Sequence, residues 1–161
     1  MAIQASIKSN SKLISKKFKH LESKLPRIID KGLKQAGFQL LDIIRTKTQK
    51  GQDFRGRPFA PYSQGYLKQL TKEGKPTRVD LFNTGRMLGS LTPSSTVKAS
   101  GKNKVSLAFS NGQMRQRALF NQVLGKNKRE FFGFNSRTEK IISKQFNRFV
   151  EKEIRGIKLW A

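Results

Sequence analysis

Apolar residues recur at helical spacing along the first third of the chain. Ile14, Phe18, Leu21 and Leu25 follow one another at steps of three or four residues, which predicts an amphipathic helix whose outer face is basic. Pro26 favours a break just before itself and suits the first position of a new helix. The pattern therefore predicts two N-terminal helices that meet at Pro26.

The second of these helices is expected to span Pro26 to about Thr48, because apolar residues continue at steps of three and four through that range. Near the other end of the chain, residues 136–156 carry one apolar stripe, which predicts a further amphipathic helix. Ser136 followed by Glu139 is typical of a capping box at the start of such a helix. Both ends of the chain are therefore expected to be helical.

The middle of the chain shows no sustained helical period. Residues 51–78 are rich in glycine and proline, which predicts a long surface loop with one short helical turn near Tyr66–Leu70. Residues 96–110 alternate apolar and polar side chains around a Ser-Gly-Lys-Asn segment, which predicts a β-hairpin. Residues 117–125 are expected to form a short helix or the end of a strand, stopped by Gly125.

This order of elements predicts an α+β fold. It comprises two N-terminal helices, a long loop, a small antiparallel β-sheet and a C-terminal amphipathic helix, with the helices covering one face of the sheet. A chain of 161 residues suits one domain with a modest core. We therefore expect a basic N-terminal helical arm over residues 1–25 and a single α+β domain over residues 26–161.

The charge balance changes the picture of what the protein contacts. The chain has 34 lysines and arginines against 10 aspartates and glutamates, a formal net charge of +24 at pH 7. Such a surplus repels itself, and a polyanion or an acidic partner surface usually offsets it. The basic residues are spread over the whole sequence, so the charge belongs to the folded body as well as to its ends.

Several classes of protein are disfavoured by what the sequence lacks. Cysteine is absent, so neither a disulfide framework nor thiolate chemistry is available. No apolar run approaches the roughly 20 residues of a membrane-spanning helix, and the first 13 residues lack the apolar block of a secretion signal. We expect a soluble protein of a reducing cytoplasm, or of a particle assembled there, with no membrane partner.

Residues that could carry catalysis are few. His20 is the single histidine and lies in a lysine-rich helical segment, so a catalytic triad or a multi-histidine metal site is excluded. A nuclease gathers two or more acidic ligands around a metal, and Asp53, Asp80, Glu130 and Glu139 show no clustered spacing. The sequence therefore predicts no enzymatic activity, no cofactor and no metal.

The aromatic residues Phe131, Phe132 and Phe134 allow two interpretations. They could form a stacking platform for nucleic-acid bases. A cluster of this kind leading into a helix is more often part of a core, and we favour that interpretation.

Several segments together carry a family resemblance. They are GQDFRGRPFAPYSQGYLK (51–68), LFNTGRMLGSL (81–91), the hairpin at 95–110, ALFNQVLG (118–125), REFFGF (129–134) and the helix at 136–156. In this order and spacing they resemble the virion morphogenesis or tail-completion proteins of tailed bacteriophages, a group that also covers neck and head–tail connector subunits. The chain has Asn121-Gln122 where that family often has His-Gln.

The resemblance implies a structural virion protein that forms a ring, commonly a hexamer, where the phage tail meets the head connector. Its partners would be further copies of the chain, the head–tail connector or adaptor, and the tail terminator or tube proteins. The ring would surround the DNA channel and contact genomic DNA without reading its sequence. The protein would be assembled in the host bacterial cytoplasm and located in the neck region of the virion.

The resemblance also implies roles for particular residues. Thr84 and Gly85 would form a tight turn that starts a short helix. The expected inter-subunit contacts lie in the long loop and are Phe54, Arg55, Phe59, Tyr62 and Tyr66. The expected contacts to DNA or to an acidic partner are Lys102, Lys104, Arg115, Arg117, Lys126 and Lys128.

Two other function classes stay open from the residues alone. The net charge suits a non-specific nucleic-acid-binding protein of the chromosome-organising or ribosome-associated type, although no groove-reading motif accompanies it. A nuclease would depend on Asp53 or Asp80 and would lose metal-dependent cleavage when either is changed to alanine. We rank both below the ring-forming virion protein.

Overall fold

The computed structural model describes residues 11–82 and 84–157 of the chain. Its elements are α1 (Ser11–Gln49), α2 (Gln64–Lys72), α3 (Arg86–Gly89), α4 (Pro93–Thr96), β1 (Val97–Gly101), β2 (Lys104–Leu107), α5 (Gly112–Leu119), the π-helical η1 (Phe120–Leu124) and α6 (Ser136–Gly156). These helices and one two-stranded antiparallel sheet make the α+β arrangement expected from the sequence. Residues 1–10 of the predicted arm, Asn83 and residues 158–161 lie outside the described residues.

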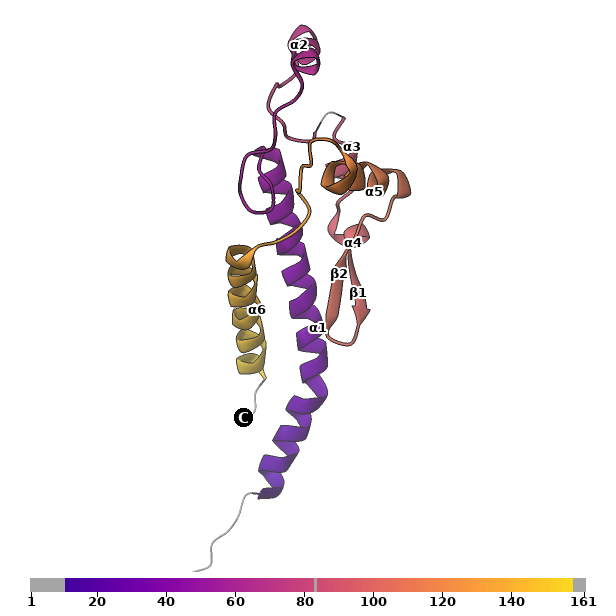
Figure 1. Cartoon of the computed structure of the whole chain (residues 1–161). Coiled ribbons are helices and arrows are strands. Elements are labelled where there is room, and N and C mark those ends of the chain that lie inside the picture. The colour runs from indigo at the N-terminus through magenta and orange to yellow at the C-terminus, as the bar shows by residue number, and fades with distance from the viewer. Residues whose placement is uncertain (1–10, 83, 158–161) are drawn as a thin grey trace, which may run out of the picture.

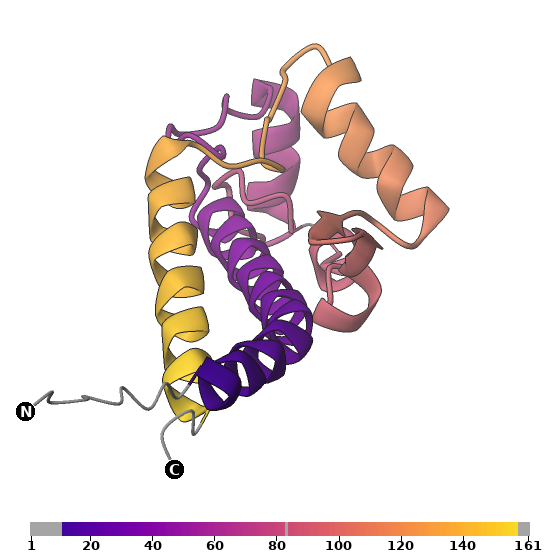
Figure 2. The same ribbon diagram turned by 90° about the horizontal axis from the view of Figure 1, so that it is seen from below.

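The N-terminal part of the chain forms one continuous helix, so the prediction of two helices meeting at Pro26 is wrong. α1 runs for 39 residues with Pro26 inside it. A proline removes one backbone hydrogen bond and crowds the preceding turn, which bends a helix or ends it. Here α1 bends in its N-terminal half, the half that contains Pro26, and continues (Figures 1 and 2). The apolar spacing also continues through the proline, and Ile28 just beyond it is buried, which offsets the lost hydrogen bond.

α1 is the element against which the rest of the fold packs. α6 contacts it on one side and the β1–β2 hairpin on the other (Figure 1). Two glycines permit this close approach. A Cβ added at Gly32 would lie 2.9 Å from a ring carbon of Phe146, and one added at Gly37 would lie 2.7 Å from Cγ1 of Val97. Each glycine lowers the stability of the helix by about 1 kcal/mol relative to alanine. In return, the absence of a side chain lets the neighbouring element contact the backbone of α1.

The hydrophobic core lies around the C-terminal half of α1. It is formed by Leu41, Ile44, Phe59, Val79, Met87, Leu88, Leu91, Val97, Phe109, Met114, Ala118 and Phe131. In contrast, Leu13, Ile14 and Phe18 near the start of α1 are exposed. The molecule therefore consists of a packed body and a helical end that projects from it (Figure 1).

The predicted hairpin is present. β1 pairs with β2 in antiparallel register, with Val97 opposite Leu107, and Lys102 and Asn103 form the turn. Asn103 adopts a φ of 56°, a left-handed conformation that asparagine tolerates better than most residues. The helix or strand end predicted over residues 117–125 is helical, in α5 and η1.

α6 begins and ends where the apolar stripe predicted, but its cap is different. The side chain of Asn135 accepts a hydrogen bond from the backbone N–H of Thr138 at 2.9 Å. The predicted capping box, with Ser136 as the cap, is therefore wrong by one residue. Asparagine and serine cap helices equally well, so the sequence alone did not distinguish two adjacent caps.

The buried hydroxyl of Thr96 gives a stability prediction. Thr96 has no exposed surface, and its Oγ1 has no hydrogen-bond partner among the described residues. An unsatisfied buried polar group costs about 1–3 kcal/mol. Replacing Thr96 with the similarly shaped valine is therefore expected to raise the free energy of unfolding by about 1 kcal/mol, measured by urea denaturation. Thr92→Val is the control, because the hydroxyl of Thr92 caps α4; that variant is expected to lose stability, and a loss of stability in Thr96→Val would contradict the prediction.

Candidate interaction surfaces

The first part of the long loop is folded onto its own chain. Asp53 accepts hydrogen bonds from the backbone N–H and the Nε of Arg57, at 2.8 and 3.1 Å. The N–H of Phe54 donates to the carbonyl of Glu130 at 2.9 Å. Phe59 is only 8% exposed and belongs to the core. The prediction that Phe59 is free to contact a neighbouring subunit is therefore wrong, because its own core takes the ring.

Phe54 and Arg55 are also engaged within the chain. The half-buried Phe54 ring packs so closely that a Cβ added at Gly133 would lie 3.1 Å from it. The Arg55 guanidinium lies 4.3 Å from the centre of that ring and forms a salt bridge with Glu130. Nζ of Lys47 donates to the Phe54 carbonyl at 2.9 Å, which ties the end of α1 to the loop. This part of the loop therefore connects the end of α1 to the segment before α6.

The second part of the loop behaves differently, because its two tyrosines remain partly open. Tyr62 and Tyr66 are half-buried and meet edge to face, with ring centres 4.9 Å apart. Ser63 caps α2 between them by accepting a hydrogen bond from the N–H of Tyr66. The predicted helical turn near Tyr66 is thus part of the nine-residue α2.

The Thr84-Gly85 segment forms the tight turn that the sequence predicted. Gly85 has a φ of 67°, precedes α3 as its N-cap, and donates its N–H to the carbonyl of Phe82 at 2.6 Å. A residue with a side chain would be strained at this φ, and its Cβ would lie 3.0 Å from the Phe82 ring. Behind the turn, Met87 and Leu88 are buried in the core. The apolar residues of α3 therefore hold the turn in place.

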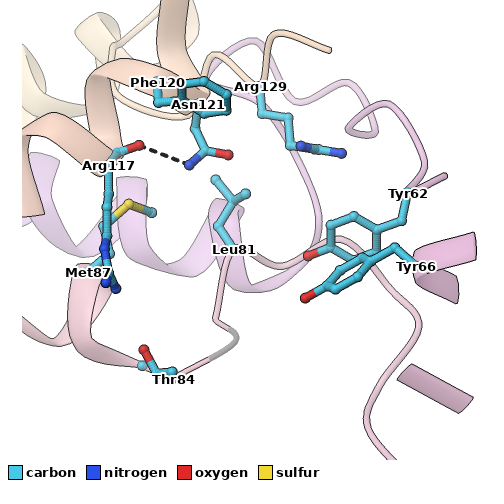
Figure 3. A pocket seen from close by; sticks show the side chains of 10 residues that line it. Tyr62, Tyr66, Leu81, Thr84, Met87, Arg117, Phe120, Asn121 and Arg129 are labelled. Atoms are coloured by element: carbon cyan, nitrogen blue, oxygen red, sulfur yellow. Dashed lines mark hydrogen bonds between the residues drawn. The ribbon is translucent and has the colours of Figure 1, made fainter. Parts of the chain in front are cut away.

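These separate motifs meet at one open groove of about 360 Å³ (Figure 3). Its lining comes from the tyrosines, the Thr-Gly turn and the α5–η1 helix, and comprises Tyr62, Tyr66, Leu81, Thr84, Gly85, Met87, Arg117, Phe120, Asn121 and Arg129. Figure 3 shows the Leu81 and Asn121 side chains pointing into the space between the tyrosines and Met87. The name tyrosine groove is used below for this hollow.

The tyrosine groove is positive and aromatic. None of the residues that line it is acidic, and Arg117 and Arg129 contribute two guanidinium groups. The Arg129 guanidinium lies 5.1 Å from the centre of the Tyr62 ring, within reach of a cation–π contact. Burial, followed by the negative charge of Asp80, raises the pKa of Tyr62. Like an ordinary tyrosine, it carries its hydroxyl proton at neutral pH and can donate a hydrogen bond.

Gln122 joins η1 to the segment before α6, a role that sequence reasoning missed. Its side-chain amide donates to the carbonyl of Phe132 and accepts from the N–H of Phe132, both at 3.0 Å. Asn121 donates to the carbonyl of Arg117 at 2.9 Å. The two Gln122 bonds join η1 to the segment that carries Phe131, whereas the Asn121 bond lies within the α5–η1 helix. The Asn121-Gln122 pair is part of the family resemblance and could have drawn attention to this residue. The pair alone does not reveal that Gln122 bonds to a backbone group ten residues further along the chain.

An apolar surface lies beside the tyrosine groove on α5 and η1. Leu119, Phe120, Val123 and Leu124 are all exposed, and Phe120 is 61% exposed. Contiguous exposed apolar residues of this kind mark interaction sites more often than isolated ones do. A π-helical turn is itself frequent at functional sites. The name η1 patch is used below for these four side chains.

The basic residues predicted to face DNA or an acidic partner do not form one surface. All six are exposed. Lys102 and Lys104 lie at the turn end of the hairpin, which points away from α5 (Figure 1). Arg115 and Arg117 lie on α5, and Lys126 and Lys128 follow η1.

Three of the four acidic residues considered for a nuclease are engaged in other roles. Asp53 bonds to Arg57, Asp80 accepts from the N–H of Phe82 at 2.9 Å, and Glu130 pairs with Arg55. Within residues 11–82 and 84–157, no group of three or more histidine, aspartate or glutamate side chains is placed to hold a metal ion. Among the same residues, no helix combines the length and the apolar character needed to cross a bilayer.

No protein-family model, no curated protein and no solved structure matches the chain.

Proposed function

We propose that the protein is a structural virion subunit of the tail-completion or neck type, which closes into a ring where a phage tail joins the head connector. The ring would contain about six copies and surround the DNA channel, and its neighbours would be the connector or adaptor and the tail terminator or tube proteins. The protein would act in the virion after assembly in the host cytoplasm, without catalysis or a cofactor. The sequence motifs described above are the basis of this assignment.

One structural observation supports the proposal most directly. The motifs of the resemblance at 51–68, 81–91 and 118–125 are distant in sequence, yet they line one open groove. Beside that groove, the η1 patch is apolar and uncovered. A chain whose most distinctive segments converge on a surface is organised for contact with another protein, because an isolated monomer gains nothing from exposed apolar side chains.

The geometry favours a head-to-tail contact between copies. Leu13, Ile14 and Phe18 on the projecting end of α1 form a second exposed apolar surface, far from the η1 patch (Figure 1). Contacts between two different surfaces of identical chains generate closed rings when the rotation closes. A subunit with two separate apolar surfaces meets this requirement.

The experiment measures assembly with Phe120→Ser. A phenylalanine that becomes buried contributes about 1.5–3 kcal/mol, so its loss is expected to weaken the contact between subunits about tenfold to a hundredfold. The wild-type chain is expected to form a closed oligomer by native mass spectrometry and electron microscopy, and Phe120→Ser is expected to dissociate at concentrations where the wild type stays assembled.

Phe38→Ser is the matched control, because Phe38 is also an exposed phenylalanine but lies on α1 outside both apolar surfaces. It is expected to assemble like the wild type. A wild-type chain that stays monomeric and is absent from mature particles would contradict the proposed function. Equal weakening by both variants would contradict the assignment of the η1 patch while leaving the ring in place.

The second function to be tested is non-specific nucleic-acid binding by the isolated chain. It is favoured by the net charge of +24 and by a row of cations on α1. Tight and steeply salt-dependent DNA binding by a permanent monomer would support it over the ring.

A further inference from the structure

A second groove lies between α1 and α6 and is strongly basic. It measures about 780 Å³, and its charged lining consists of Lys24, Arg27, Lys31, Lys152 and Glu153, with His20 at one end. None of these residues was singled out as a DNA contact from the sequence. The name α1–α6 groove is used below for this hollow.

The cations on α1 lie on one face of the helix. His20, Lys24, Arg27 and Lys31 are spaced by four, three and four residues, which places them within an arc of about 60° on one face of a helix with 3.6 residues per turn. The row extends about 16 Å along the helix axis. Lys152 adds a cation from α6, which runs beside α1 (Figures 1 and 2).

The cations of the groove are free of carboxylate partners. Among the described residues, none of Lys24, Arg27, Lys31 and Lys152 takes part in a salt bridge, whereas Arg55, Arg57, Lys75 and Arg155 each do. All four lysine and arginine side chains of the groove are exposed. Their charges therefore face solvent, where a ligand can reach them.

The net charge of the groove stays positive after the nearby negative charges are subtracted. Four full positive charges face one carboxylate, that of Glu153. α6 ends beside the groove at Gly156, and a helix C-terminus carries about half a negative charge. The groove therefore keeps about two and a half positive charges even when His20 is neutral.

Two other hollows on the surface do not share this property. The hollow along α6 mixes Lys140, Lys144 and Arg148 with Glu139 and Glu151. The hollow near the long loop is lined by Arg55 and Arg57, which are paired with Glu130 and Asp53. Although the whole chain is basic, the α1–α6 groove is a place where cations are gathered, aligned and unpaired.

We infer that the α1–α6 groove binds the sugar–phosphate backbone of nucleic acid. A backbone is a line of negative charges, and a line of cations matches it without reading bases. An acidic protein would be expected to bring apolar contacts as well, and the groove offers only Ile28 and Ile157 for them. Nucleic acid is therefore the occupant that the lining fits.

The test compares two triple variants of the full chain by fluorescence anisotropy with a 30-base-pair DNA duplex between 50 and 200 mM salt. The groove variant is Lys24→Gln, Arg27→Gln, Lys31→Gln. The control is Lys102→Gln, Lys104→Gln, Arg115→Gln, which removes the same charge from residues that the resemblance implied. Each phosphate contact adds about 0.9 to the slope of log affinity against log salt.

The groove variant is expected to lose about 2.7 from that slope, and the control less than half as much. Over this fourfold range of salt, the wild type should then lose about 40-fold more affinity than the groove variant does. Lys152→Gln alone is expected to lose about 0.9, since it removes one contact from the other helix. All substituted residues are exposed, and circular dichroism melting verifies that each variant is folded.

Three outcomes would overturn the inference. They are an equal loss of slope in both triple variants, no loss in the groove variant, and binding of poly-L-glutamate with the same affinity and the same dependence on the groove cations. The last outcome would assign the groove to an acidic protein instead. The inference goes beyond the proposed ring and does not depend on it. If the protein stays monomeric and its DNA binding depends on the groove, the proposed ring is rejected and the groove assignment stands. If the protein assembles into a ring but the groove variant binds DNA like the wild type, the groove assignment is rejected and the ring stands.

Discussion

Replacing Phe131 with alanine is expected to lower the free energy of unfolding by about 3–5 kcal/mol, the usual cost of deleting a buried aromatic ring. Phe131 is 1% exposed. Its ring meets Phe109 and Phe132 edge to face, with centres 6.4 and 6.1 Å away. The loss includes the cavity left behind, because the ring is fully buried in the core. Urea denaturation followed by circular dichroism measures it.

Phe134→Ala is the control for this prediction, in the same aromatic segment. Phe134 is 55% exposed, and surface substitutions usually change stability by less than about 0.5 kcal/mol. A similar loss in the two variants would show that the segment does not pack as described. The pair also tests the two interpretations of the aromatic cluster, since Phe131 belongs to the core and Phe134 alone remains open to a partner.

Leu91→Ala is expected to cost about 2–5 kcal/mol of unfolding free energy. Leu91 has no exposed surface and follows α3 directly. It belongs to the same buried cluster as Met87, which lines the tyrosine groove, so its loss should loosen the groove as well as the core. Thermal and urea unfolding measure the stability, and tyrosine fluorescence reports on Tyr62 and Tyr66.

Ile141→Ala provides the comparison, because Ile141 is 43% exposed on α6 and lies outside both apolar surfaces. It is expected to unfold within about 0.5 kcal/mol of the wild type. If Leu91→Ala also lowers the free energy of unfolding by less than about 0.5 kcal/mol, the described packing of Leu91 in the core is wrong.

Periodicity predicted the elements whose residues follow one repeat. The apolar stripe placed α6 at residues 136–156, where it is found. The alternation around Lys102 and Asn103 placed the hairpin. These predictions succeeded because each depends on neighbours within one or two turns of the chain.

The failures came where distant contacts decide the outcome. Pro26 was expected to end a helix, but burial just beyond it favours continuation. Phe59 was expected on a surface loop, but the hydrogen bond from its N–H to the Gly51 carbonyl folds the loop inward. Neither contact has a local signature. Both depend on elements that meet only in the folded chain.

The candidate sites divide in the same way. The tyrosines, the Thr-Gly turn and Arg117 were named from the sequence, and the fold brings them to one groove. The α1–α6 groove was not foreseen, although the spacing of Lys24, Arg27 and Lys31 was visible. Many rows of lysine in a basic helix simply face water. What distinguishes this one is α6, which lies beside it and contributes Lys152.

The glycines at positions 32 and 37 have a mechanical consequence. At both places a side chain of the neighbouring element, the ring of Phe146 or a methyl group of Val97, rests directly against the backbone of α1. Tilting the projecting end of α1 should therefore displace α6 and the hairpin together, because both pack against the same helix. Strain applied to that end would reach opposite flanks of the molecule at once.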